Sequence, residues 1–77
     1  MTISTVRVAL PDGGVATRRT ARTYTHVICA RGWRADDWGA LVPVRWAGRS
    51  DLARKQVVDL ERRGYTGVVA VPVPDRS

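Results

Sequence analysis

The chain has 77 residues, a net charge of +6 and an apolar fraction of 44%. This length is enough for one small domain with a core of limited stability, and the apolar fraction excludes a disordered tail. Twelve arginines and one lysine stand against seven acids, so the chain attracts polyanions.

A single cysteine, Cys29, excludes an internal disulfide and indicates a reducing compartment. The chain has no apolar stretch near the roughly 20 residues that span a bilayer. Its start also lacks the basic and apolar regions of a secretory signal. We therefore expect a cytoplasmic protein, with no membrane partner.

Two strands are predicted in the first part of the chain. Residues 5–10 alternate between apolar and polar side chains, and the turn formers Pro-Asp-Gly-Gly follow them. Residues 15–31 are rich in Thr and Val and contain neither glycine nor proline, which predicts one long or bent strand. Ile28 breaks its alternation, so a bulge is expected there.

The second part predicts a strand, a helix and a final strand. We interpret residues 32–41 as a loop and residues 42–46 as a strand. The helix is expected from Ser50, as its N-cap, to Gly64, at the position after its C-cap. Residues 67–73 favour a strand whose Pro72 suits an edge or an end, because proline donates no ladder hydrogen bond. Its pairing partner is not readable from the sequence.

These elements predict a single α+β domain with an antiparallel sheet of three or four strands, in the order β-β-β-α-β, and one helix packed on one face. Apolar strand residues are expected to face the helix. Side chains in a strand alternate between the two faces, so arginines would gather on the uncovered face of the sheet. The residues assigned to the helix side are Val6, Val8, Leu10, Val27, Cys29, Val42, Val44 and Trp46.

The uncovered face is the candidate site. Guanidinium groups hold phosphates and fork to guanine edges, and aromatic rings stack on bases. We interpret it as a nucleic-acid-binding face, against the alternative of an ordinary solvated sheet face. The three tryptophans are expected to serve as core or loop anchors rather than base platforms. The candidate residues are Arg7, Arg18, Arg22, Tyr24, His26 and Arg45.

Catalysis and cofactors have no support in the sequence. One histidine and one cysteine cannot supply the four ligands of a structural zinc site. His26 has no recognisable nucleophile and orienting carboxylate around it, and the adjacent pair Asp36 and Asp37 is typical of a turn. We therefore predict no enzyme activity, no metal and no cofactor.

The segments THVICARG and VRWAGRSDLARKQVVDLERRGYTG carry a resemblance that covers most of the chain. The chain resembles short uncharacterised proteins of actinobacterial phages and mobile elements, which implies an accessory protein in a host bacterial cell. Its strand order is also similar in architecture to three-stranded DNA-binding domains of the AP2 and integrase-arm type. Two other partners remain open: a host protein that the chain modulates, or a second copy bound through the C-terminal strand, as in a virion component.

Overall fold

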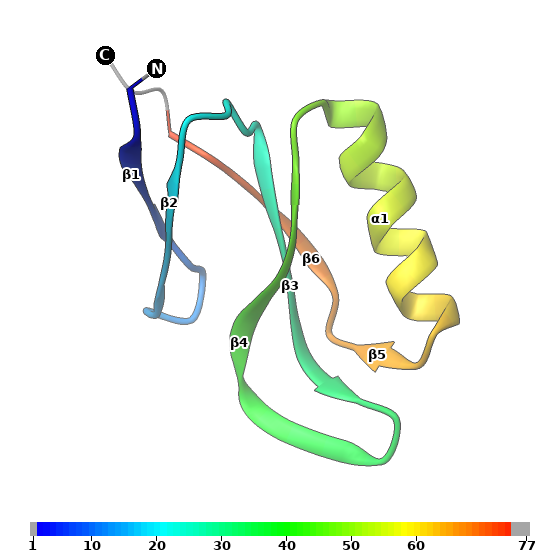
Figure 1. Ribbon diagram of the computed structural model, residues 1–77. Coiled ribbons are helices and arrows are strands. Elements are labelled where there is room, and N and C mark those ends of the chain that lie inside the picture. Colours follow the sequence, from blue (N-terminus) through cyan, green and yellow to red (C-terminus); the bar gives the residue numbers. More distant parts are fainter. Residues whose placement is uncertain (1, 75–77) are drawn as a thin grey trace.

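The computed structural model describes residues 2–74. In this part of the chain one α-helix packs against antiparallel sheet, which confirms the predicted α+β fold (Figure 1). The elements in chain order are β1 (Ser4–Ala9), β2 (Val15–Thr20), β3 (His26–Trp33), β4 (Asp36–Ala47), α1 (Ser50–Arg62), β5 (Tyr65–Thr66) and β6 (Val69–Pro72).

Strand β3 is the centre of the larger sheet. It pairs with β4 on one side and with β5 and β6 on the other. Strands β5 and β6 are interrupted at Gly67, whose φ is +62°. A Cβ at Gly67 would lie 2.9 Å from Cβ of Arg31 in β3, so glycine allows this segment to approach β3 closely. The partner that the sequence left open for the final strand is therefore β3.

The prediction of one strand over residues 15–31 was wrong. Strand β2 ends at Thr20 and pairs only with β1, and residues 21–25 carry the chain to the larger sheet. The Thr20 hydroxyl accepts a hydrogen bond from the backbone N–H of Arg22 at 2.9 Å. Local bonds of this kind compete with the strand ladder, so a threonine ends the strand without glycine or proline.

The loop predicted over residues 32–41 was also wrong. Strands β3 and β4 form a long hairpin with Arg34 and Ala35 at its tip. The pairing shifts twice, first between Ile28 and Cys29 and again between Ala30 and Gly32. The first shift confirms the bulge expected near Ile28.

Helix α1 begins at Ser50, as expected, but Arg49 is its N-cap residue. Arg49 has extended backbone (φ −148°) and no side chain caps the first turn, so the prediction of Ser50 as N-cap was wrong. At the other end Gly64 follows the C-cap with φ +101°, as predicted. Its carbonyl accepts a bond from the N–H of Arg34 at 2.7 Å, which ties the helix end to the β3–β4 tip.

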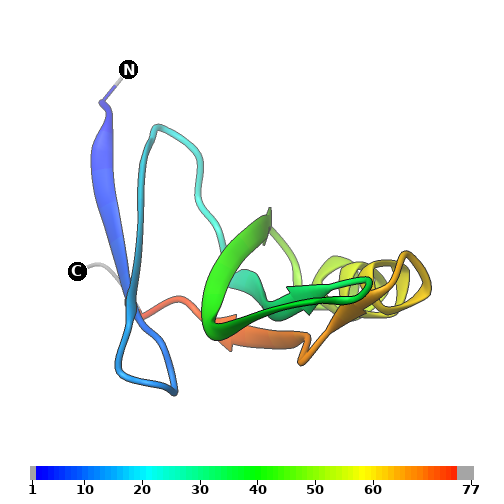
Figure 2. The same cartoon turned by 90° about the horizontal axis from the view of Figure 1, so that it is seen from below.

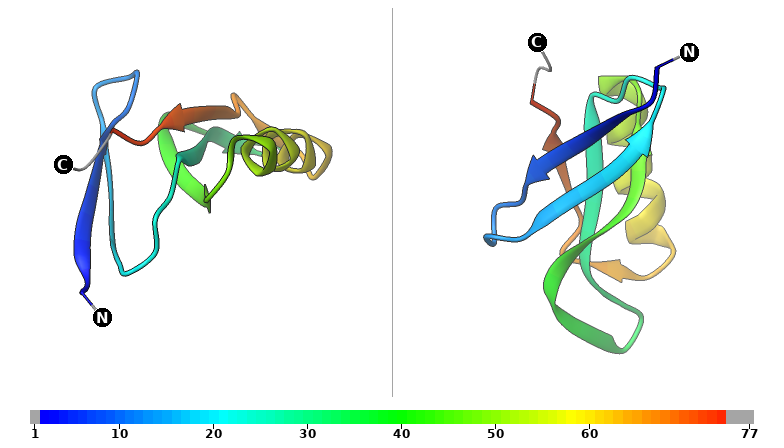
Figure 3. Two further views of the ribbon diagram at one scale, coloured as in Figure 1. Left: turned by 90° about the horizontal axis from the view of Figure 1, so that it is seen from above. Right: turned by 60° about the vertical axis from the view of Figure 1, so that its left-hand side comes forward.

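The larger sheet is the middle of three layers. The β1–β2 hairpin lies on one side and α1 on the other, as the right-hand view of Figure 3 shows with the hairpin in front and the helix behind. The helix-side core contains Ile28, Ala47, Ala53 and Leu60. The hairpin-side core contains Val6, Val8, Leu10, Ala16, Val27, Cys29, Leu41 and Val71.

Within residues 2–74 no helix combines the length and apolar character needed to cross a membrane.

Candidate nucleic-acid interface

The bare sheet face expected from the sequence does not exist. Val27 and Cys29 point to the hairpin, whereas Ile28 points to the helix, and all three are fully buried. The expectation that Val27 and Cys29 lie under the helix together with Val6 and Val8 was therefore wrong. A strand with apolar residues in both registers is typical of burial on both faces, and Ile28 was the residue that carried this signal.

The β1–β2 hairpin that covers this face projects from the body of the molecule (Figure 2). Its inner side carries Val6, Val8 and Ala16 into the core. Its outer side is exposed along both strands and is mostly polar. The residues on that outer side are Thr5, Arg7, Ala9, Val15, Thr17 and Arg19.

Two of the six predicted site residues meet at the open end of this hairpin. The guanidinium carbon of Arg18 lies 5.5 Å from the ring centroid of Tyr24. The Tyr24 ring in turn lies 5.6 Å from the Trp46 ring, tilted by 52°. Arg18 is opposite the buried Val6 in the hairpin register, so its side chain starts on the inner side, although the residue as a whole is exposed. Trp46 packs against the hairpin-side core, so it is a core anchor as expected, but its assignment to the helix side was wrong.

Two more predicted residues belong to the same hairpin unit. Arg7 is exposed on the outer side, and Arg22 is exposed just after β2. Arg19, which the sequence reasoning did not select, follows Arg18 in the chain and lies on the outer side. We call Arg7, Arg18, Arg19 and Arg22 the hairpin arginines. Among the described residues none of them forms an ion pair with an acid.

The last two predicted residues lie elsewhere, on the helix side of the sheet. Arg45 is opposite Ile28, and its Nη2 lies 3.8 Å from Oδ2 of Asp59 in α1. His26 lies at the edge of α1, with its Nδ1 2.9 Å from the Thr25 hydroxyl. Placing these two on one face with Arg18 and Tyr24 was wrong, because the shared face does not exist.

Asp12 is the only acid in the described part of the hairpin, and it lies at the turn, away from the open end. Its carboxylate accepts hydrogen bonds from the N–H of Gly14 at 3.0 Å and of Leu41 at 2.8 Å. These two bonds, with the Leu41 bond the stronger influence, lower the pKa of Asp12 below its usual value of 3.8. Asp12 therefore serves to fasten the hairpin turn to β4.

A second group of aromatic residues lies at the tip of the β3–β4 hairpin. The Trp33 and Tyr65 ring centroids are 6.0 Å apart, and Trp38 meets Tyr65 edge-on at 6.3 Å. The Arg34 guanidinium lies 4.4 Å above the Trp33 ring. The sequence treated these tryptophans as loop anchors, and Trp33 does join the tip to the end of the helix. Trp38 remains 43% exposed.

Within the described residues no three potential metal-ligating side chains of His, Cys, Asp or Glu come together. Comparison of the chain with protein-family models, with curated proteins and with solved structures found no match. The resemblance to actinobacterial phage proteins therefore stays a prediction.

Proposed function

We propose that this chain binds the phosphate backbone of nucleic acid through the hairpin arginines, as a small accessory protein of a phage or mobile element. The observation that carries the proposal is the Arg18 guanidinium, which lies 5.5 Å from the Tyr24 ring centroid and is unpaired with any described acid. Arg7 and Arg19 add positive charge on the outer side of the hairpin and Arg22 adds it just after β2, whereas the one acid of the hairpin is bound at the far turn.

The cation–π contact with Tyr24 gives Arg18 an advantage over a mobile surface arginine. A cation–π contact contributes about 0.5–1 kcal/mol at an exposed site and restricts the side chain. The N–H donors at the edge of the guanidinium stay available, and they match two phosphate oxygens at once. Less side-chain entropy is then lost when a phosphate binds.

The shape of the hairpin favours duplex DNA. A two-stranded ribbon fits the major groove, which is about 12 Å wide. The exposed outer side of β1–β2, with Arg7 and Arg19 on neighbouring strands, would enter the groove while Arg18 and Arg22 contact the phosphates beside it. Tyr24 has Arg18 and Trp46 as ring neighbours, so base stacking on it is not part of the proposal.

The test is a titration of fluorescently labelled duplex and single-stranded DNA, followed by anisotropy at several salt concentrations. The two phosphate contacts of Arg18 and Arg22 predict a slope of about −1.8 in log K against log salt for duplex DNA. The variant Arg18→Gln/Arg22→Gln should weaken duplex binding by at least about tenfold, since each lost charge-assisted bond contributes about 1.5 kcal/mol or more.

The matched control is Lys55→Gln/Arg62→Gln, which removes the same charge from the exposed outer side of α1. It should change the affinity much less. Equal losses in the two variants would mean that only net charge matters, and the hairpin would then have no special role. No binding of either DNA at about 50 mM salt, where electrostatic binding is strong, would end the proposal.

The competing function is modulation of a host protein. The outer edge of β6 favours it, because an extended segment of a partner protein can add to such an edge as a further strand. A pull-down from host lysate treated with nuclease separates the two functions. Specific retention of one host protein, together with no DNA affinity, would favour the competitor.

A further inference from the structure

Strand β6 forms an outer edge of the larger sheet. The N–H of Val73 donates to the carbonyl of Thr25 at 2.8 Å, which extends the pairing of β6 with β3. Hydrogen-bonding directions alternate along a strand, so Val71 and Val69 also face β3. Ala70 and Pro72 then point their backbone groups away from the sheet. Pro72 has no N–H to donate on this outer side, which agrees with the prediction that its strand lies at an edge.

A groove runs between this edge and one side of α1. Val57, Val58 and Ala70 contribute apolar side chains to its lining. Val58 is 48% exposed, which is unusual for a valine in the centre of a helix beside a core. The groove is lined by His26, Ser50, Ala53, Arg54, Val57, Val58 and Ala70.

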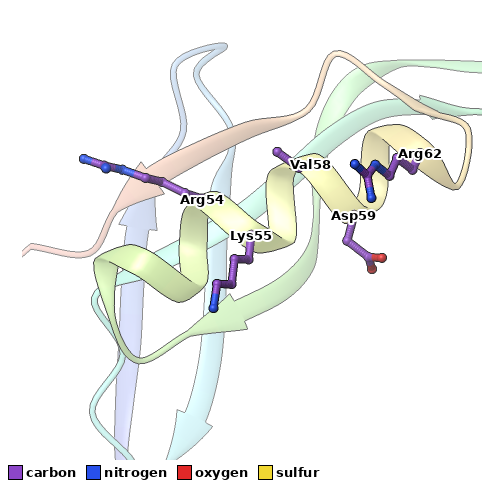
Figure 4. Close-up of a pocket in the computed structure, with 5 residues that line it drawn as sticks. All are labelled: Arg54, Lys55, Val58, Asp59 and Arg62. Carbon is purple, nitrogen blue, oxygen red and sulfur yellow. The ribbon is translucent and has the colours of Figure 1, made fainter.

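The two sides of α1 differ in their charges. Figure 4 shows Arg54 and Val58 projecting from one side of the helix and Lys55 and Asp59 from the other. At about 100° per residue, Glu61 falls on the same side of the helix as Arg54 and Val58, although it is not among the residues that line the groove. Along this side the helix therefore presents a positive charge, then valine, then a negative charge.

Neither charge of the groove side has a partner within the described residues. Asp51 pairs with Arg49, and Asp59 pairs with Arg45 and Arg63. Glu61 and Arg54 are exposed and take part in none of these ion pairs. A surface with plus at one end, minus at the other and an apolar centre is complementary to itself after a two-fold rotation.

We propose that the occupant of this groove is a second copy of the chain, bound about a two-fold axis next to Ala70 and Val58. The two β6 strands pair antiparallel, so that Ala70 of each copy donates to and accepts from Ala70 of the other. The two sheets become one continuous sheet, with both helices on the same face. Arg54 of each copy reaches Glu61 of the other across the groove, and Val58 loses its exposure.

The association should be reversible and weak. Among residues 69–72, only Ala70 offers both an outward N–H and an outward C=O, and Pro72 offers a carbonyl alone. Each copy also carries a net charge of +6, which opposes self-association. A monomer–dimer equilibrium that shifts with concentration is therefore expected.

Sedimentation equilibrium of the full chain, without nucleic acid and at about 150 mM salt to screen distant charges, tests the proposal. The average mass should rise with concentration from 8.5 kDa toward twice that value. Arg54→Glu and Glu61→Arg, each tested alone, should place like charges across the interface and keep the chain monomeric. Combining the two exchanges the charges and should restore the dimer.

Lys55→Glu is the matched control for Arg54→Glu, because it makes the same charge change on the other side of the helix. It should leave the dimer intact. A constant mass of 8.5 kDa for the unsubstituted chain would overturn the proposal. Failure of the double variant to restore the dimer, with circular dichroism showing a folded protein, would also overturn it. Loss of DNA binding in the earlier test would not affect this outcome.

Discussion

Replacement of Val8 by alanine tests whether the β1–β2 hairpin is packed on the sheet. Val8 is 1% exposed within the hairpin-side core. The substitution removes two methyl groups, which contribute about 0.8 kcal/mol each when buried. The cavity left behind adds about 1 kcal/mol, so the total loss should be about 2–3 kcal/mol. A chain of this size has a free energy of unfolding of roughly 4–12 kcal/mol, so this loss is a large share.

Val15→Ala is the control, because it makes the same change in the same hairpin at a residue that is 61% exposed. It should cost less than about 1 kcal/mol, mainly through strand propensity. The assay is urea unfolding followed by tryptophan fluorescence. With a slope of about 1 kcal/mol per molar, the midpoint should fall by about 2–3 M for Val8→Ala. Equal, small shifts for the two variants would refute the packing of the hairpin and return the sheet to an uncovered face.

Two further predictions concern single positions. A Cβ at Gly32 would lie 2.5 Å from the backbone oxygen of Asp36, so Gly32→Ala should lower the free energy of unfolding in urea by about 1–3 kcal/mol or more. The control is Gly48→Ala, whose Cβ would lie 3.5 Å from the nearest oxygen and which should cost far less. Similar costs for the two variants would contradict this reasoning. The folded-state pKa of Asp12 is lowered by its bonds to Leu41 and Gly14. Its stabilising effect should therefore be complete above the unfolded pKa near 3.8 and disappear as the pH falls through the lower folded value. Asp12→Asn should flatten this part of the pH profile of unfolding, and an unchanged profile would contradict the assignment.

Local signals in the sequence predicted the helix well. These signals are the alternation of apolar and charged residues, Asp51 in the first turn and Gly64 after the last turn. Each depends only on residues within one or two helical turns. The prediction of Ser50 as the N-cap was wrong because a serine at the start of a helix caps it only if its side chain reaches the free N–H groups of the first turn. Here Arg49 occupies the N-cap position, and its side chain makes no capping hydrogen bond.

The faces of the sheet could not be predicted, because they depend on which element covers each side. The sequence shows that Val27 and Ile28 are both apolar, but it does not show that the hairpin folds over one and the helix over the other. This error moved His26 and Arg45 into the wrong group. The contact of Arg18 with Tyr24 depends on the turn after Thr20. This turn contains no glycine or proline, so the sequence did not indicate it.

Val71 of β6 lies in the same core as Val6 and Val8 of β1, so residues near opposite ends of the described chain are neighbours. During synthesis the hairpin emerges first, but its apolar side finds no complete partner until the ribosome has released β6. Contacts between such distant residues also slow folding in general. The hairpin-side core should therefore close only after β6 has left the ribosome, and a nascent chain arrested before that point should leave β1 and β2 open to proteases.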